Sequence, residues 1–168
     1  MGEIITGSTP STQHTEYYDT EGIPWVTPTD IDTNIVSSTA RKLSTEGKKV
    51  ARIVPANSIL VTCIASIEKN ALLLTEGSFN QQINCVVPSE EYNPYFLLTE
   101  SELWSDEMKK HASSGTMQIV NKKEFSELVT FVPHKKEQEQ IGQTFASLDN
   151  LLTLHQCKWI FAIVRSLR

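Results

Sequence analysis

The sequence of 168 residues has no long hydrophobic run, and this absence argues against a membrane-spanning helix. No apolar stretch approaches the ~20 consecutive residues that a helix needs to cross a bilayer. The first residues, Met1 to Ile5, also lack the basic region and the long apolar core of a secretion signal. We therefore expect a cytoplasmic protein with no membrane partner.

Cysteine is scarce as well, which argues against a disulfide framework and against a zinc site. Cys63, Cys85 and Cys157 are widely separated, and they form no set of cysteines and histidines with the spacing of a zinc site. Cys63 and Cys85 lie within apolar runs, so we expect them to be small core residues. We expect this chain to bind no metal and no cofactor.

The residue constellations of an enzyme are also missing. There is no glycine-rich phosphate loop and no dinucleotide-binding fingerprint. No nucleophile stands at a recognisable spacing from a base, and no pair of carboxylates is placed for acid and base chemistry. We therefore expect a non-catalytic protein with no catalytic residues.

Positive charge is scarce overall but clustered. The formal net charge of −5 argues against a nonspecific nucleic-acid coat, because such proteins neutralise many phosphates with Lys and Arg. A specific DNA reader needs only a local cluster. An ordinary solvated surface also explains any single basic pair, and the dipole of a helix end explains the pair at 109–110 equally well. The residues that we select for DNA binding are Arg41, Lys42, Lys48, Lys49, Arg52, Lys109 and Lys110.

Short apolar segments predict an α+β fold with a small mixed sheet. Residues 1–49 carry many turn signals and little that favours a long helix. Four later segments are rich in β-branched residues and bounded by Pro, Asn or Gly, which is typical of buried strands. These predicted strands are Val50–Val54, Ser58–Ile67, Ala71–Thr75 and Ile83–Val87.

The second half of the chain predicts short helices and one further strand. Asn93 followed by Pro94 is a favourable helix start, and Gly115 is the expected end of that helix. Asn121 with Glu124 has the spacing of a capping box for a short helix. The apolar segment 128–132 is the expected last strand, directly before Pro133.

After Pro133 the sequence predicts one long helix with an apolar seam. A helix that continues to the terminus would be ~50 Å long, more than is needed to close the core of one domain. Steps of three, four and seven residues are typical of a coiled coil, so we expect a partner helix. The seam residues selected as a subunit interface are Ile141, Phe145, Leu148, Leu152 and Trp159. A second apolar row contains Leu151, Leu154, Ile160, Ile163 and Leu167.

An ordered set of fragments resembles the target recognition domain of type I restriction-modification DNA specificity subunits. The fragments are Gly7-Ser8-Thr9-Pro10, Ile23-Pro24-Trp25-Val26-Thr27-Pro28 with Asp30-Ile31, Ser66-Ile67, Asn80-Gln81-Gln82, Gly115-Thr116, and Pro133 with Glu137-Gln138, Ile141, Phe145 and Leu148-Asp149. Glu68 departs from the pattern, because the family usually has glycine there. The aromatic end after Leu154 departs as well, because the family usually continues with a basic helix.

The resemblance implies a half-subunit that recognises double-stranded DNA. Residues 1–132 would form the target recognition domain, and residues 133–168 a long spacer and dimerisation helix. The expected partners are a modification methyltransferase subunit, which would bind S-adenosylmethionine, a restriction subunit, and a second copy of this chain. The amides of Asn80-Gln81-Gln82 could pair with adenine. However, relatives with different targets share this segment, so we expect a structural role for it.

Two other functions remain open from the sequence. One is a helical protein-interaction or dimerisation module whose globular part binds no DNA, which would agree with the acidic charge and the long seam. The other is a recognition domain fused to the catalytic part of a single-chain restriction-modification enzyme.

Overall fold

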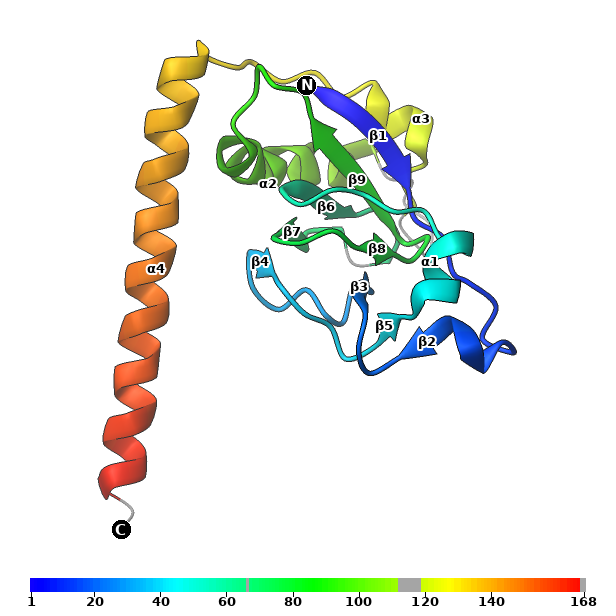
Figure 1. Ribbon diagram of the computed structural model, residues 1–168. Coiled ribbons are helices and arrows are strands. Elements are labelled where there is room, and N and C mark those ends of the chain that lie inside the picture. The colour runs from blue at the N-terminus through cyan, green and yellow to red at the C-terminus, as the bar shows by residue number, and fades with distance from the viewer. Residues whose placement is uncertain (66, 112–118, 167–168) are drawn as a thin grey trace.

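The computed structural model describes residues 1–65, 67–111 and 119–166, with the side chains of His111 and of residues 156–166 outside the description. Two sheets form the centre of the body, and the long helix α4 (Lys135–Ser166) runs along one side and projects past it (Figure 1). The predicted α+β class and the predicted long C-terminal helix are both confirmed. Within the described residues, no helix has the length and hydrophobicity needed to cross a membrane.

The larger sheet has five strands in the order β1-β9-β6-β7-β4, antiparallel except where β4 runs parallel to β7. Its strands are β1 (Gly2–Thr6), β4 (Ile35–Val36), β6 (Ser58–Thr62), β7 (Asn70–Leu73) and β9 (Ile83–Pro88). Every residue of β6 and β7 is buried, which explains why their sequences show no apolar-polar alternation. The sheet is therefore covered on both faces.

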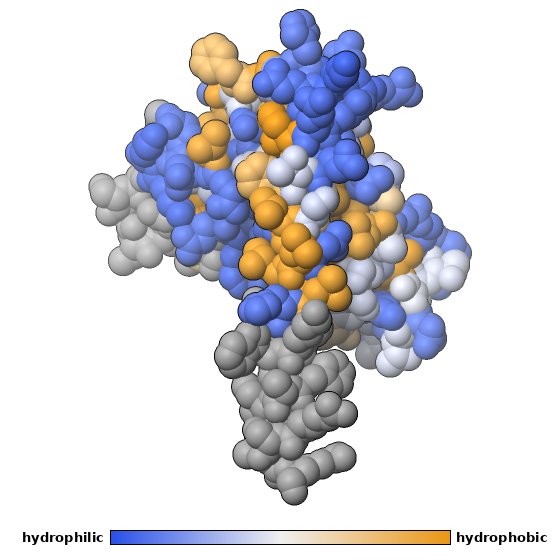
Figure 2. All heavy atoms as spheres, turned by 90° about the vertical axis from the view of Figure 1, so that its left-hand side faces the viewer, coloured by the Kyte–Doolittle hydropathy of each residue, from blue (hydrophilic) through white to orange (hydrophobic). Residues whose placement is uncertain are grey.

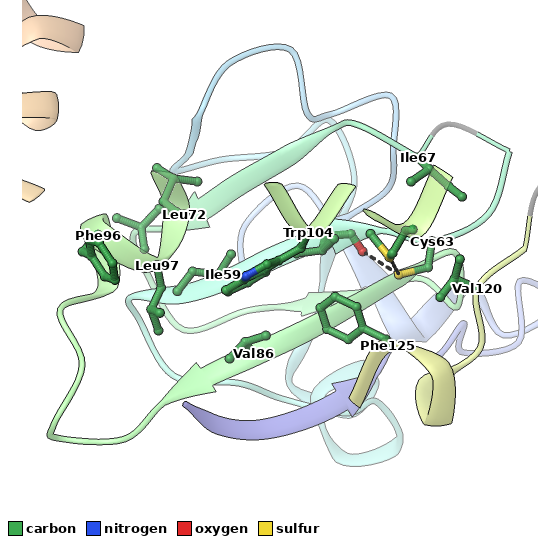
Figure 3. Close-up of a cluster of buried hydrophobic side chains, with 13 residues drawn as sticks. Ile59, Cys63, Ile67, Leu72, Val86, Phe96, Leu97, Trp104, Val120 and Phe125 are labelled. Atoms are coloured by element: carbon green, nitrogen blue, oxygen red, sulfur yellow. Dashed lines mark hydrogen bonds between the residues drawn. The ribbon is translucent and has the colours of Figure 1, made fainter. Parts of the chain in front are cut away.

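One face of this sheet packs against helix α2 (Pro94–His111) and the short helix α3 (Lys122–Ser126). Ile59 and Val86 from the sheet meet Leu97 and Trp104 from α2, and Phe125 of α3 meets the Trp104 ring edge to face (Figure 3). The predicted caps explain these helix starts. Asn93 Oδ1 accepts a hydrogen bond from Phe96 N at 2.9 Å, and Asn121 forms a complete capping box with Glu124.

The opposite face is covered by loops and by the smaller four-stranded sheet. Its strands, in the order β2-β5-β3-β8, are β2 (Tyr18–Asp19), β5 (Lys42–Leu43), β3 (Ile23–Val26) and β8 (Ser78–Phe79). The second hydrophobic cluster lies on this side and includes Leu60, Leu73 and Cys85 from the large sheet together with Val26 and Phe79. Here also lie the single turn η1 (Thr15–Tyr17) and the short helix α1 (Thr45–Val50).

The predicted strand Val50–Val54 is wrong. Residues 45–50 form α1, because Ser44 caps the helix by accepting a hydrogen bond from Gly47 N and Lys48 and Lys49 complete its last turn. Val54 forms only an isolated bridge with Gly77. The edge strand next to β9 is β1, which lies in the segment where the sequence predicted turns.

The predicted strand at 128–132 is also wrong. This segment pairs with no strand among the described residues, and Val129 and Phe131 are 85% and 94% exposed. The β-branched residues of this segment led to the strand prediction. A strand, however, forms only where a neighbouring backbone is available for pairing. The segment is instead a connection between α3 and α4 in which Leu128 and Val132 pack against the core and Val129 and Phe131 are exposed. The end predicted for α2 at Gly115 lies outside the described residues.

Candidate nucleic-acid interface

The segment Gly7-Ser8-Thr9-Pro10 is the point where the two sheets and their loops meet. Gly7 N and Ser8 N donate to carbonyl oxygens of residues 83 and 79, and Ser8 O accepts from Trp25 Nε1 at 3.1 Å. A side chain at Gly7 would place its Cβ 2.0 Å from the carbonyl oxygen of Asn80, so only glycine fits this approach. The segment thus ties the end of β1 to β8, β9 and β3.

The Trp25 to Asp30 segment holds a second set of loops in place. The Asp30 carboxylate accepts hydrogen bonds from Thr27 N, Thr27 Oγ1 and Ala40 N at 2.9, 2.6 and 3.3 Å. These bonds fix the loop after β3 and the start of the chain that leads into β5. The family-like residues here act as a scaffold for neighbouring loops.

The Asn80-Gln81-Gln82 segment makes hydrogen bonds within the body. Asn80 is 8% exposed, its Oδ1 accepts from Gln82 N, and its Nδ2 donates to Gln82 Oε1 at 2.9 Å. Thr9 Oγ1 donates to Gln81 Oε1. These bonds engage the side-chain oxygens of all three residues, and the structural role expected from the sequence stays a prediction.

Arg41 stacks on two aromatic side chains at the edge of the smaller sheet. Its guanidinium carbon lies 5.1 Å from the centroid of the Tyr18 ring and 5.8 Å from that of Trp25. The two rings contact each other edge to face, and Tyr18 OH donates to Pro10 O at 2.6 Å. Burial raises the pKa of Tyr18, while the nearby Arg41 opposes that rise, so the phenol stays neutral beside the cation. The sequence placed Arg41 in a basic cluster but gave no sign of this stacking.

The other residues of this basic cluster lie on β5, on α1 and directly after α1. Lys48 is ion-paired with Glu76, and Lys49 Nζ lies 2.5 Å from Glu46 Oε1. Arg52 Nη1 donates to Thr6 O at 2.7 Å, and its backbone N–H donates to Ser8 Oγ. The side chains of Lys48, Lys49 and Arg52 are exposed, and surface pairs of this kind are weak enough for a phosphate to replace the carboxylate.

Lys109 and Lys110 lie on a different element, in the last turn of α2, among carboxylates. Lys109 Nζ is 2.8 Å from Glu68 and 3.9 Å from Asp106, and Lys110 Nζ is 2.9 Å from Glu107. Hydrogen bonds to these carboxylates raise the pKa of both lysines. Both the helix dipole and these carboxylates therefore account for their position, and DNA contact stays a prediction.

Glu68 occupies a position where the backbone favours glycine. Its φ of 158° lies in the region that residues with a Cβ rarely adopt. At this position the chain thus has a backbone angle that suits glycine, although the residue is glutamate. The nearby Lys109 lowers the pKa of Glu68, so this turn carries a charged carboxylate.

The first half of α4 is docked on the N-terminal end of α2. Gln138 is 2% exposed, and its Oε1 accepts from Asn93 N at 3.1 Å. Gly142 allows close approach, because an added Cβ would lie 2.4 Å from Asn93 Oδ1. Tyr95 OH donates to Asp149 Oδ2 at 2.5 Å, and burial together with this bond raises the pKa of Tyr95. The sequence marked Gln138 and Asp149 only as parts of the resemblance; their contacts with α2 were not foreseen.

On the described part of α4, most residues of the apolar rows are uncovered. Of the predicted interface residues, Ile141 is half-buried against the core, whereas Phe145, Leu148 and Leu152 are 45%, 47% and 60% exposed. Leu151 and Leu154 in the second row are 63% and 60% exposed. Figure 2 shows these apolar side chains gathered above the grey end of the helix. The side chain of Trp159 lies outside the described residues.

The described residues offer little chemistry for catalysis. Burial raises the pKa of Cys63 to about 11 and that of Cys85 to about 12, so both thiols remain protonated near neutral pH and are poor nucleophiles. Both are buried, as the sequence predicted. No group of three or more metal-binding side chains occurs in residues 1–65, 67–111 and 119–166.

Comparison with known proteins supports the resemblance found in the sequence. A family model described as a type I restriction modification DNA specificity domain matches residues 1–160. The chain is 30% identical over 142 residues to the type I restriction enzyme HindI specificity subunit of Haemophilus influenzae, covering 81% of this chain and 31% of that protein. It is 28% identical over 160 residues to the EcoR124I/EcoR124II specificity subunit of Escherichia coli, covering 90% of this chain and 39% of that protein.

Solved structures give the same fold. A chain from a study of complex assembly and conformational transition of the type I R-M system has a TM-score of 0.71 at 15% identity, covering 90% of this chain and 37% of that one. The HsdS subunit of Thermoanaerobacter tengcongensis has a TM-score of 0.69 at 15% identity, with 90% and 36% covered. At this identity the structures establish the fold alone. The aligned part of the chain spans less than two fifths of each of the curated relatives named above.

Proposed function

Because this chain belongs to the family of type I restriction modification DNA specificity domains, we propose that it is a specificity half-subunit that recognises a short DNA sequence. The observation that carries the proposal is the family match over residues 1–160. The loop scaffold built by Gly7, Trp25 and Asp30 supports it, because loops held on a rigid frame are suited to reading base edges.

We assign DNA recognition to residues 1–132 and the spacer and docking role to residues 133–168. The basic residues Arg41, Lys42, Lys48, Lys49 and Arg52 would hold the recognition domain on DNA. Lysines with exposed ammonium groups can exchange a carboxylate for a phosphate at little cost. Lys109 and Lys110 are secondary candidates, because they lie on α2 and not in the Arg41 to Arg52 cluster, and Lys109 contacts two carboxylates.

The partners follow from the proposed role. The half-subunit would direct a modification methyltransferase subunit, which binds S-adenosylmethionine, and a restriction subunit to the target in the cytoplasm. The chain itself would perform no chemistry and carry no cofactor. Incubation of the purified protein with labelled S-adenosylmethionine and mixed-sequence DNA should therefore transfer no label. Sequence-specific transfer without another subunit would disprove this part of the proposal.

A second copy of the chain is the proposed partner for the uncovered rows of α4. Two antiparallel helices would place two identical recognition domains at opposite ends, so the joint DNA target would be palindromic. Sedimentation over a concentration series tests this. A chain that stays monomeric at ~100 μM, where an interface of ~5–6 kcal/mol would still be detected, would exclude the homodimer.

The DNA-binding proposal is tested by selection from a pool of randomised duplexes. We expect the full chain to enrich a short common sequence, with affinity that falls as salt rises. The double variant Lys48→Ala and Lys49→Ala should weaken binding to all duplexes and lower the slope of log affinity against log salt by about 0.9 for each phosphate that is no longer neutralised. Absence of any enriched sequence at low salt would favour the alternative, a helical protein-interaction module that uses the apolar rows of α4 and binds no DNA.

The third alternative, a recognition domain of a fused restriction-modification enzyme, concerns the gene rather than the fold. The coding sequence on either side of this chain decides it. Separate neighbouring genes for a methyltransferase and a helicase-like nuclease would support the half-subunit.

A further inference from the structure

We infer that Arg41 is a base-reading residue that recognises a guanine in the DNA target. This inference rests on the proposed DNA-binding function. It distinguishes Arg41 from the basic residues that would contact phosphates, and it predicts at least one essential G·C pair in the recognised sequence.

The first argument is that the guanidinium is held in place before any ligand binds. Trp25 is 5% exposed and Tyr18 is half-buried, so the two rings form a fixed surface under the Arg41 head group. Trp25 Nε1 donates to Ser8 O and Tyr18 OH to Pro10 O, and these bonds fix the orientation of both rings. A cation over the faces of aromatic rings is attracted electrostatically by the rings, and this attraction favours the observed position of the guanidinium.

The backbone of Arg41 is fixed as well. Its carbonyl oxygen accepts hydrogen bonds from Trp25 N at 3.3 Å and from Thr39 Oγ1 at 2.5 Å. One residue earlier, Ala40 N donates to the Asp30 carboxylate. The residues that carry the family resemblance therefore position Arg41, although Arg41 is not one of them. A family-shared scaffold that presents a residue outside the shared set is the arrangement expected for a specificity determinant.

The third argument comes from the contrast with neighbouring cations. Lys48 and Lys49 are paired with carboxylates, and the Arg52 guanidinium donates to a backbone carbonyl. Among the described residues, no carboxylate forms an ion pair with Arg41. The guanidinium lies over the two rings, and among the described residues no hydrogen bond engages its N–H groups, so these donors are available. A planar fork of donors matches O6 and N7 of guanine in the major groove, which is the commonest specific arginine contact with DNA.

The test compares binding of wild-type and variant full-length chains to the duplex selected by the wild type and to duplexes with one G·C pair replaced. We expect Arg41→Lys to bind the selected duplex about 5- to 150-fold more weakly, because lysine keeps the charge but lacks the fork. The salt dependence should remain unchanged. The variant should also bind equally well when one particular G·C pair is replaced by A·T, a change that weakens wild-type binding by the same factor.

Variants of the aromatic surface separate recognition from folding. Tyr18→Phe keeps the ring and should retain the preference for guanine, whereas Tyr18→Leu removes the ring and should reduce it. Lys49→Gln is the matched control for charge and should weaken all duplexes alike. Thermal unfolding of each variant establishes that the fold is intact.

Three results would overturn the inference. They are an equal loss on all duplexes for Arg41→Lys, an unchanged affinity for Arg41→Lys, and an equal loss on all duplexes for the uncharged variant Arg41→Gln with a salt slope lowered by about 0.9, which would mark a phosphate contact. If the wild type itself enriched no sequence, the proposed function would fail, and the inference with it. A motif enriched by the wild type that responds in the same way to Arg41→Lys at every position would overturn the inference alone.

Discussion

Helices α2 and α4 have similar apolar periodicity but differ in what covers their apolar residues. Phe96, Leu97, Trp104 and Met108 of α2 are at most 3% exposed, whereas Phe145, Leu148, Leu151, Leu152 and Leu154 of α4 are 45–63% exposed. The difference lies in the partner: α2 packs on a sheet of the same chain, whereas the contacts of α4 with the body that the structure describes lie in its first half. The buried apolar residues of α2 therefore stabilise the fold, and the exposed apolar residues of α4 between Phe145 and Leu154 are available for another molecule.

The largest effect expected from this comparison is at Trp104. Trp104→Ala should lower the free energy of unfolding by about 3–5 kcal/mol, because the ring is 3% exposed and leaves a large cavity. The adjacent residue Leu103 is 60% exposed, so Leu103→Ala should change stability by less than about 0.5 kcal/mol. Urea unfolding followed by circular dichroism measures both. Equal effects would mean that α2 does not pack as described.

A smaller effect is expected at Gly142, where α4 touches α2. The added methyl group of Gly142→Ala would crowd Asn93 Oδ1 at 2.4 Å and Phe96 N at 3.1 Å. Overpacking of this kind costs about 1–3 kcal/mol, and the better helix propensity of alanine returns ~1 kcal/mol. We expect a net loss in urea unfolding. Gln143→Ala on the exposed side of the same helix is the control and should be neutral or slightly stabilising.

The cap of α2 should contribute somewhat less. Asn93→Ala removes the acceptor for Phe96 N and should destabilise the chain by about 1 kcal/mol. Asn93→Ser keeps an oxygen near that N–H and should recover most of the loss. Thermal unfolding of the three proteins under the same conditions provides the comparison. A full loss in both variants would assign the effect to the Asn93 contact with α4 instead.

The smallest effect on folding is expected in the uncovered part of α4. Leu152→Ala should change the unfolding free energy of the monomer by less than about 0.5 kcal/mol, because the side chain is 60% exposed. The same variant should weaken self-association about tenfold or more if the residue becomes buried between two helices. Sedimentation at several concentrations separates the two quantities. Destabilisation of the monomer would contradict the comparison between the helices.

The sequence predicted the elements whose signals are local. Apolar β-branched runs identified the buried strands β6, β7 and β9, and Asn93 and Asn121 marked the starts of α2 and α3. It was wrong where the outcome depended on a neighbouring backbone. Gly2–Thr6 became a strand because β9 lies beside it, and residues 128–132 did not because no strand among the described residues does.

The candidate site was predictable only as a set of charges. Clustering in the sequence selected Arg41 and Lys48, but it could not show that one stacks on aromatic rings and the other pairs with Glu76. Both contacts join residues at least 16 positions apart along the chain, counting from Trp25 to Arg41. The family resemblance identified the scaffold residues Gly7, Trp25 and Asp30 individually, which composition did not. Each of these residues holds several loops together at once.

The hydrogen bonds of the loop scaffold have a consequence for how such a protein changes over generations. Trp25, Tyr18 and Asp30 bond to main-chain atoms of the loops, at Ser8 O, Pro10 O and Ala40 N. The Asp30 carboxylate also accepts from the Thr27 side chain, which lies within the same scaffold segment. A main-chain atom is present whatever residue occupies the position. Loop side chains can therefore be exchanged without loss of these bonds, so new recognition properties can arise by a few substitutions while the frame that supports them is inherited intact.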